Sequence, residues 1–236
     1  MSEPLFEVKN LTVDYGSKKP ALRNVSLTVE PGERLAIVGP SGSGKTTLLR
    51  CLVGIEQPTA GTVLYRGESV GRSRASGQRV RRETGFIAQD PQSSFNPLLT
   101  VESSLWETAT AHLSFRARHR ARPAVRARTL ELLQELALSE DSINRYPHEF
   151  SGGQRQRIAI ARALITDPTT LVADEPVSAL DVLARQRFVA TLLDVVASRE
   201  LTLITVTHDL TIVPNLATRL IELRNGEITQ DTALPA

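Results

Sequence analysis

A glycine-rich loop between a short apolar run and an amphipathic segment constrains the fold of this chain more than any other feature. Residues 34–38 form an apolar run that predicts a buried strand, and residues 46–53 have the apolar spacing of a helix. Between and beside them stand Gly39, Pro40, Ser41, Gly42, Ser43, Gly44, Lys45, Thr46 and Thr47. Glycine lets a backbone curve closely around a ligand, and amides at a helix N-terminus bind anions. The pattern predicts an α/β fold with a phosphate site.

The loop contains the side chains that nucleotide phosphates require. Lys45 supplies a positive charge for the β and γ phosphates, and Thr46 supplies a hydroxyl for Mg²⁺. The alternative is a glycine-rich turn in which the lysine is incidental. The order of strand, loop and helix matches the Walker A motif in the context that it requires, which favours nucleotide binding. We therefore expect ATP as the ligand, Mg²⁺ as the cofactor, and nucleotide contacts from residues 39–47.

Two adjacent carboxylates follow a second apolar run. Residues 170–173 predict another buried strand, and Asp174 and Glu175 come directly after it. Such a pair can be an acidic loop, but beside a phosphate site each carboxylate has a use. Asp174 would hold Mg²⁺ through water, as a Walker B aspartate does, and Glu175 would be the general base for the attacking water. Because neighbouring strand residues point to opposite faces, we expect the two side chains to take different roles.

Further polar residues stand where predicted strands end or a helix begins. Tyr15 follows the first strand, Gln89 follows a strand at residues 84–88, and His208 follows a strand at residues 201–207. A glycine-rich turn before a helix comprises Ser151, Gly152, Gly153 and Gln154. A segment after the carboxylate pair comprises Ser178, Ala179, Leu180 and Asp181. With these motifs in this order, the chain resembles the ATP-binding cassette (ABC) transporter ATPase subunits over nearly its whole length.

The resemblance implies a role for each motif. Tyr15 would stack on adenine, His208 would contact the γ phosphate and the catalytic water, and Gln89 would reach the metal and sense a membrane partner. Residues 151–154 resemble the family signature, which lies on the γ phosphate of the opposite subunit. Residues 178–181 resemble the D-loop, which crosses the dimer interface. The implied catalytic residues are Glu175, His208 and Gln89, and the implied metal ligands are Thr46, Gln89 and Asp174.

The resemblance also implies a P-loop NTPase core (RecA-like) with an antiparallel β subdomain and an inserted helical subdomain. Residues 5–29 show the alternation of antiparallel strands, and residues 97–146 have a helical pattern. We expect a single ABC ATPase domain over residues 1–236. The catalytic core and β subdomain would occupy about residues 1–95 and 156–236. The helical subdomain would occupy about residues 96–155.

A narrower resemblance concerns the transported solute. Residues 89–101, which include the pair Asn96-Pro97, and residues 146–164 resemble the peptide and nickel importer branch of the family. This branch implies an ATP-hydrolysing, energy-coupling subunit of an importer for peptides, nickel or other small solutes. The partners would be a second ABC ATPase subunit (identical or paralogous), transmembrane permease subunits and an extracytoplasmic substrate-binding protein. The departures from the family pattern remove no catalytic group: they are Ala88, Phe150 and Val177, where Phe, Leu and Thr are usual.

The composition is that expected of a cytoplasmic ATPase. The 236 residues, 41% of them hydrophobic, suffice for one large α/β unit. No run approaches the about 18 apolar residues of a membrane span, and Met1 is not followed by a signal peptide. The single cysteine, Cys51, indicates a reducing compartment and a packing role. We expect a peripheral position on the cytoplasmic side of the cell membrane. The end at Ala236, without a proline-rich extension, favours a shorter relative of the oligopeptide subunits or a trimmed chain.

An alternative function is a soluble ABC ATPase that acts on nucleic acid or ribosomes. Such relatives usually have two cassettes or long coiled-coil insertions, so transport is favoured here. A basic run comprises Arg116, Arg118, Arg120, Arg122, Arg126 and Arg128. Nucleic-acid sites interleave aromatic stackers with basic residues, and only Phe115 is near this run. The run is therefore interpreted as a solvated helix face, with anionic lipid headgroups as the alternative, and no nucleic acid partner is expected.

Overall fold

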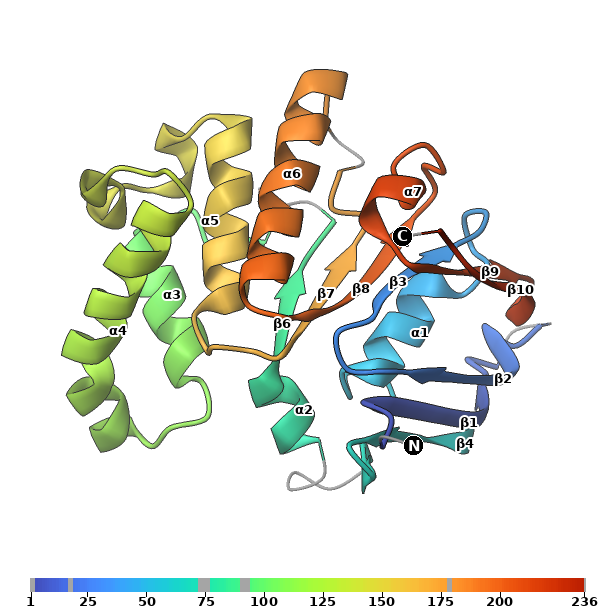
Figure 1. The fold of residues 1–236 in the computed structure, drawn as a ribbon. Helices are drawn as coiled ribbons and strands as arrows, with labels where there is room; N and C mark the ends of the chain where they lie inside the picture. Colours follow the sequence, from blue (N-terminus) through green and yellow to red (C-terminus); the bar gives the residue numbers. More distant parts are fainter. Residues whose placement is uncertain (1–2, 17–18, 72–76, 90–93, 178–179, 236) are drawn as a thin grey trace.

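The computed structural model describes residues 3–16, 19–71, 77–89, 94–177 and 180–235 as two sheets with helices packed around them (Figure 1). The strands are β1 (Phe6–Val13), β2 (Leu22–Val29), β3 (Arg34–Val38), β4 (Ala60–Tyr65), β5 (Glu68–Ser69), β6 (Thr84–Ile87), β7 (Thr170–Asp174), β8 (Thr202–Thr207), β9 (Arg219–Arg224) and β10 (Glu227–Ala233). The α-helices are α1 (Lys45–Leu52), α2 (Gln78–Glu83), α3 (Val101–Thr110), α4 (Phe115–Glu135), α5 (Gly152–Leu164), α6 (Val182–Ser198) and α7 (Val213–Leu216). Two 3₁₀ helices are η1 (Glu140–Asn144) and η2 (Pro147–Glu149).

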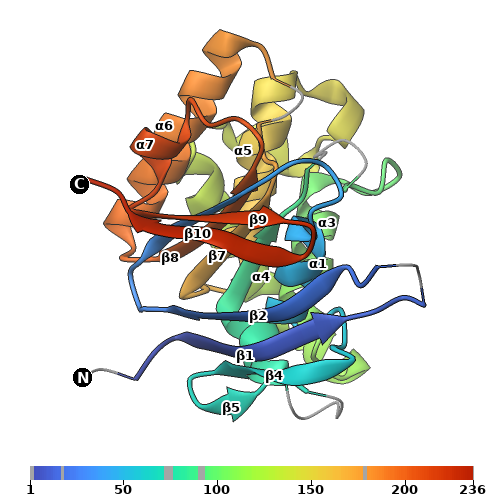
Figure 2. The ribbon, with the colours of Figure 1, turned by 90° about the vertical axis from the view of Figure 1, so that its right-hand side faces the viewer.

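The smaller sheet is antiparallel and has the strand order β2-β1-β4-β5. Phe6 pairs with Val29 across β1 and β2, and Phe6, Val8, Leu11 and Val13 are all buried. This alternation agrees with the antiparallel sheet predicted from residues 5–29. Figure 2 shows these strands beneath the edge of the larger sheet that β9 and β10 form.

The larger sheet has the order β10-β9-β3-β8-β7-β6, and only β10 runs antiparallel to its neighbour. Strands β3, β8, β7 and β6 are neighbours and parallel, so their carboxyl ends meet at one edge of the sheet. Ligands of open α/β sheets bind at this edge. The chain leaves these four strands at Val38, Thr207, Asp174 and Ile87, which brings the four predicted motifs that follow them together.

Two large hydrophobic clusters hold the layers together. One lies between the sheets and contains Phe6 of β1, Leu48 of α1 and Ile37 of β3. Cys51 is buried in this cluster, as its predicted packing role requires. The other joins the larger sheet to α3, α4, α5 and α6, and it contains Leu133 and Leu192. The first cluster fixes the phosphate loop against the sheet, because α1 begins where that loop ends.

Some elements were not predicted from the sequence. The polar composition of residues 66–82 predicts a flexible linker, whereas the described part of this segment contains β5 and most of α2. Helix α6 also had no prediction, although Phe188, Leu192 and Val195 recur at helical spacing and are buried. Asp181 caps this helix, since its Oδ1 accepts a hydrogen bond of 2.8 Å from the amide of Ala184. Among the described residues, no helix combines the length and the apolar character that a membrane span requires.

Gly85 is expected to be essential for the packing of β6 against α5. A Cβ atom on Gly85 would lie 2.2 Å from the carbonyl oxygen of Ala163 and 2.8 Å from a methyl carbon of Leu171. The backbone oxygen cannot move without displacing α5, so Gly85→Ala should lower the free energy of unfolding by about 1–3 kcal/mol. Urea denaturation would measure this change. Gly152→Ala is the matched control, because nothing lies within 4 Å of its added methyl group; equal stability of the two variants would contradict the prediction.

Candidate active site

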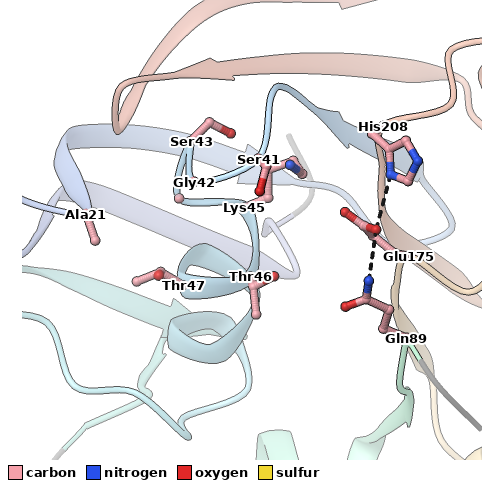
Figure 3. Close-up of a pocket in the computed structure, with 11 residues that line it drawn as sticks. Ala21, Ser41, Gly42, Ser43, Lys45, Thr46, Thr47, Gln89, Glu175 and His208 are labelled. Atoms are coloured by element: carbon pink, nitrogen blue, oxygen red, sulfur yellow. Dashed lines mark hydrogen bonds and ion pairs between the residues drawn. The ribbon is translucent and has the colours of Figure 1, made fainter. Parts of the chain in front are cut away.

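A cavity of about 730 Å³ opens at the carboxyl edge of the larger sheet (Figure 3). The phosphate loop and the start of α1 form one wall. The residues that follow β6, β7 and β8 form the other, so segments far apart in the sequence meet here. The lining residues are Ala21, Ser41, Gly42, Ser43, Gly44, Lys45, Thr46, Thr47, Gln89, Glu175 and His208.

Two glycines let the loop take its shape. Gly39 and Gly44 have φ angles of 148° and 104°, which L residues with side chains rarely adopt. A Cβ on Gly39 would lie 2.1 Å from the carbonyl oxygen of Leu223, and a Cβ on Gly44 would lie 2.4 Å from that of Ala21. The carbonyl of Ser43 also accepts a 3.1 Å hydrogen bond from the amide of Gly226. The loop is therefore wedged between β2 and the turn that joins β9 to β10.

The Lys45 side chain lies inside the curve of its own loop. It is 6% exposed, and its Nζ donates hydrogen bonds to the carbonyl oxygens of Gly39 (2.8 Å) and Pro40 (3.1 Å). An ammonium group has three donors. These bonds hold the charge at the cavity wall, within a loop that has the geometry of an anion site. Gly39 and Pro40 take part in the site through these carbonyls and do not line the cavity themselves.

Thr46 and Asp174 form a second polar pair below the loop. The Thr46 hydroxyl donates to Asp174 Oδ1 over 3.3 Å, and the carboxylate is 8% exposed. Burial raises the pKa of Asp174 above its usual value, and the neighbouring Glu175 adds to the rise. The hydrogen bond from Thr46 and the charges of Arg50 and Lys45 only partly counter this effect. Asp174 is thus a buried carboxylate that a further cation would stabilise.

Glu175 connects two other polar residues that line the cavity, Gln89 and His208. Its Oε2 accepts a 3.2 Å hydrogen bond from Nε2 of Gln89 and lies 3.1 Å from Nδ1 of His208 (Figure 3). Strand β7 ends at Asp174, and Glu175 has a φ of 46°. The expectation that the carboxylates sit on opposite faces of one strand therefore needs a correction. The left-handed turn at Glu175, not the alternation of a strand, directs its side chain to the cavity.

The predicted signature lies away from this cavity. Ser151 Oγ accepts a 3.3 Å hydrogen bond from the amide of Gln154, and Gln154 Oε1 accepts one of 3.0 Å from the amide of Ser151. This capping box starts α5. Ser151, Gly153 and Gln154 line a separate hollow of about 530 Å³ between α5 and α6. Within one chain, the two glycine-rich motifs do not form a common site.

Other predicted residues have different positions. Tyr15 is 57% exposed and does not line the cavity, although its hydroxyl donates a 2.9 Å hydrogen bond to Glu56. Leu180 and Asp181 precede α6, whereas Ser178 and Ala179 lie outside the described residues. Ala21 lines the cavity and was not predicted. It contributes backbone and a methyl group, and neither gives a chemical signal in a sequence.

The chain has known relatives among curated proteins. The ABC transporter family model matches residues 22–178. The oligopeptide transport ATP-binding protein OppF of Streptococcus pyogenes is 36% identical over 235 residues, which are 98% of this chain and 75% of that protein. The dipeptide transport ATP-binding protein DppF of Lactococcus lactis is 39% identical over 239 residues, with the same two shares.

Solved structures have the same fold. An ATP-binding cassette solved as a dimer in a post-hydrolysis state with ADP and Pi is 32% identical, with a TM-score of 0.80 over 98% of this chain and 99% of that one. The cbiO1 protein of Clostridium perfringens, part of an ABC transporter complex, is 25% identical, with a TM-score of 0.83 over 98% and 89%. These similarities confirm the predicted P-loop NTPase fold.

Proposed function

The chain belongs to the ABC transporter family, and from that premise we propose that it is the ATP-hydrolysing, energy-coupling subunit of a peptide importer. Relatives named as oligopeptide and dipeptide transport ATP-binding proteins match 98% of this chain, and this near-complete match carries the proposal. Members of the family bind and hydrolyse ATP, and the chain is an ATPase of this kind. The relatives' names favour peptides over the nickel alternative.

The cavity suits the triphosphate of ATP. The loop amides and the Lys45 ammonium lie together at one wall, where they would bind the β and γ phosphates. Residues 39–47 thus form the proposed phosphate site. The Lys45 Nζ atom is bonded to carbonyls of its own loop. From this position the side chain can turn to a phosphate oxygen with little movement of the backbone.

The donor set beside the loop fits Mg²⁺. Asp174 is a buried carboxylate with a raised pKa, and the Thr46 hydroxyl is bonded to it. Among the described residues, no cluster of three or more His, Cys, Asp or Glu could hold an ion by itself. Mg²⁺ is usually held by one or two carboxylates together with substrate phosphates. We assign Thr46, Asp174 and Gln89 as the residues that would hold it; when bound, the ion neutralises charge on the phosphate oxygens.

Glu175 is the proposed general base. Its carboxylate borders the cavity and is oriented from two sides, by Gln89 and by His208. A carboxylate held in this way can accept the proton of a water molecule that attacks the γ phosphate. His208 is 60% exposed at its side chain, which leaves it free to contact the phosphate as well. Gln89, Glu175 and His208 are therefore the proposed catalytic group.

We propose that the signature acts on the nucleotide of a second subunit. The start of α5 carries the partial positive charge of a helix N-terminus, and Gly152 and Gly153 leave open space in front of it. In the single chain this surface has its own hollow, apart from the phosphate cavity. Two subunits that close face to face would bring each signature onto the other's γ phosphate, with Leu180 and Asp181 at the interface. ATP then favours the closed dimer, and hydrolysis releases it.

Mixing two inactive variants is expected to restore part of the ATPase activity. Lys45→Ala damages the phosphate loop, and Gly153→Asp places a carboxylate where the other subunit's phosphate would lie. A mixed dimer has one site in which both motifs are intact. A mixture in equal amounts should reach at most about a quarter of the wild-type rate, since half of its dimers are mixed. If light scattering detects dimers in the mixture and the mixture stays inactive, the proposed placement of each signature on the other subunit's nucleotide is contradicted.

As an ABC ATP-binding subunit, the protein works as a dimer with permease components at the membrane. We propose that it lies on the cytoplasmic side and that a substrate-binding protein outside the membrane delivers the peptide. The helical subdomain, about residues 96–155, would transmit the closing motion to the permease. The second ATPase subunit of the transporter would be either another copy of this chain or a paralogue.

The basic run on α4 is largely engaged within the protein. The Arg118 guanidinium lies 4.7 Å from the centre of the Trp106 ring. Arg126 forms a 2.6 Å ion pair with Glu102 of α3. Arg128 pairs with Glu131 and Asp167, each at 3.1 Å. These contacts support the interpretation as a solvated helix face and give no support to a nucleic-acid partner.

Co-purification tests the proposed function. The tagged chain, extracted from its native cells in mild detergent, should bring a multi-span permease with it. Mass spectrometry of the complex would identify that partner, and a co-purified peptide-binding protein would define the solute class. Recovery of ribosomal or DNA-bound proteins in place of a permease would contradict the importer and favour the alternative.

A further inference from the structure

The cavity has two chemically different ends. Figure 3 shows Gln89, Glu175 and His208 on one side, and Ala21 and Thr47 on the other. A triphosphate bound in the loop places its reacting γ phosphate beside Glu175. The rest of the nucleotide then extends toward Ala21 and Thr47, so the base is expected at that end.

Tyr15 belongs to the segment beside this end, because the carbonyl of Val13, two residues before it, accepts a 2.8 Å hydrogen bond from the amide of Ala21. Burial raises the pKa of its hydroxyl, the Glu56 carboxylate adds to the rise, and the nearby Thr47 side chain lowers it. Tyr15 is therefore a neutral hydrogen-bond donor next to a residue that lines the cavity. With 57% of its surface exposed, the side chain still has room for a contact with a planar ligand.

The Tyr15 side chain is fixed from both directions. On the backbone side, the amide of Asp14 donates to Thr59 Oγ1 over 2.9 Å, and Asp14 Oδ1 accepts from the amide of Gly16 over 2.8 Å. At the tip of the ring, the hydroxyl donates to Glu56 Oε2 over 2.9 Å. An exposed aromatic ring with a tethered tip loses little freedom when it binds a ligand.

Glu56 is itself held in place after the end of α1. Its amide donates to the carbonyl of Arg50 over 3.1 Å, and its Oε1 accepts from the amide of Gln57 over 3.2 Å. The carboxylate thus uses one oxygen for its own loop and the other for Tyr15. The segment that follows the phosphate-loop helix therefore holds the ring at the base end of the cavity.

We propose that Glu56 is a positioning residue for nucleotide binding, which orients the Tyr15 ring as a stacking face for the nucleobase. The inference rests on the proposed role of Tyr15 and extends it to a second residue. Glu56 does not touch the nucleotide in this arrangement. It lowers the cost of ordering the ring, because the ring is already in position before the ligand arrives.

A positioning role has a consequence for base selectivity. In this arrangement Glu56 acts through the Tyr15 ring, so its carboxylate does not read the edge of a base. Stacking on an aromatic ring tolerates any base. Loss of Glu56 should therefore weaken the binding of ATP and the binding of GTP by similar factors. The affinity for inorganic tripolyphosphate, which has no base, should not change.

Equilibrium binding to the full chain tests the proposal with three ligands: ATP, GTP and tripolyphosphate. Glu56→Ala should raise the Kd of ATP and of GTP about 2- to 10-fold, the cost of ordering one free side chain. Glu56→Gln should keep wild-type affinity, since its amide oxygen can still accept the Tyr15 bond. In a Tyr15→Phe background, which has no hydroxyl to hold, Glu56→Ala should have no further effect. In steady-state hydrolysis, Glu56→Ala should raise KM and leave kcat unchanged.

Several outcomes would overturn the proposal. A loss confined to ATP would mean that Glu56 reads adenine directly. An equal loss for tripolyphosphate, or the same loss in the Tyr15→Phe background, would mean that Glu56 acts on the phosphate loop and not through the ring. Thermal unfolding of each variant controls for a general loss of structure. If Tyr15→Ala leaves ATP affinity unchanged, both the role of Tyr15 and that of Glu56 fail, while tripolyphosphate binding still reports on the proposed phosphate site.

Discussion

Glu175→Gln is expected to lower the kcat of ATP hydrolysis about 100- to 10,000-fold while ATP still binds, the range in which a general base contributes. The amide keeps the size of the side chain and can still contact Gln89 and His208. It cannot accept a proton from water. The bound ATP then persists, so the variant should accumulate as an ATP-bound dimer. Phosphate release measures the rate, and size-exclusion chromatography with ATP measures the dimer.

The control for this variant is Glu140→Gln, which makes the same chemical change at an exposed position in η1. It should hydrolyse ATP at the wild-type rate. Turnover of Glu175→Gln at that same rate would exclude Glu175 as the base. A variant that loses ATP binding together with hydrolysis would point to a role of Glu175 in holding the nucleotide.

The sequence predicts the core of this fold because the core strands are continuous apolar runs. Residues 34–38, 84–88 and 170–173 are short, largely apolar and followed by glycine or polar residues. Parallel strands that are buried on both faces have this sequence pattern. Their order in the sheet follows from the fold family and places the motifs that follow them at one edge. The phosphate loop is predictable for the same local reason, since a strand, a loop and a helix are consecutive in the chain.

The patterns of the separate elements do not predict contacts between distant segments, and only the family resemblance implied that Glu175, His208 and Gln89 share one site. Gln89 and Glu175 are 86 residues apart, and Glu175 and His208 are 33 apart, yet all three are hydrogen-bonded around one carboxylate. Periodicity reports which face of an element is buried, not which side chains meet. The turn at Glu175 is a further example, because its φ of 46° depends on the packing of the segment and not on residue type.

The basic run on α4 was open to two interpretations for a related reason. A count of arginines gives charge density, but the acidic partners lie on other elements. Glu102 comes from α3, and Asp167 lies in the segment between α5 and β7. Only the packing of α4 against these segments reveals that Arg126 and Arg128 face carboxylates. Sequence alone therefore overstates the free positive charge of this surface.

Lys45→Ala is expected to weaken ATP binding about 10- to 150-fold, because one charge-assisted hydrogen bond contributes about 1.5–3 kcal/mol. The ammonium is the cation that the loop encloses, and at 6% exposure it is little screened by solvent. Its removal also leaves the carbonyls of Gly39 and Pro40 without their donor. Fluorescence titration with a labelled nucleotide would measure the Kd directly.

Lys9→Ala is the matched control for the loss of a lysine. Lys9 pairs with Glu7 on the surface, its side chain is 57% exposed, and such pairs contribute little. Its removal should leave the Kd within the error of the measurement. Unchanged ATP binding in Lys45→Ala, in a protein that unfolds at the wild-type temperature, would refute the assignment of the phosphate loop. Because tripolyphosphate has no base, a loss of affinity for both ATP and tripolyphosphate would locate the effect at the phosphates.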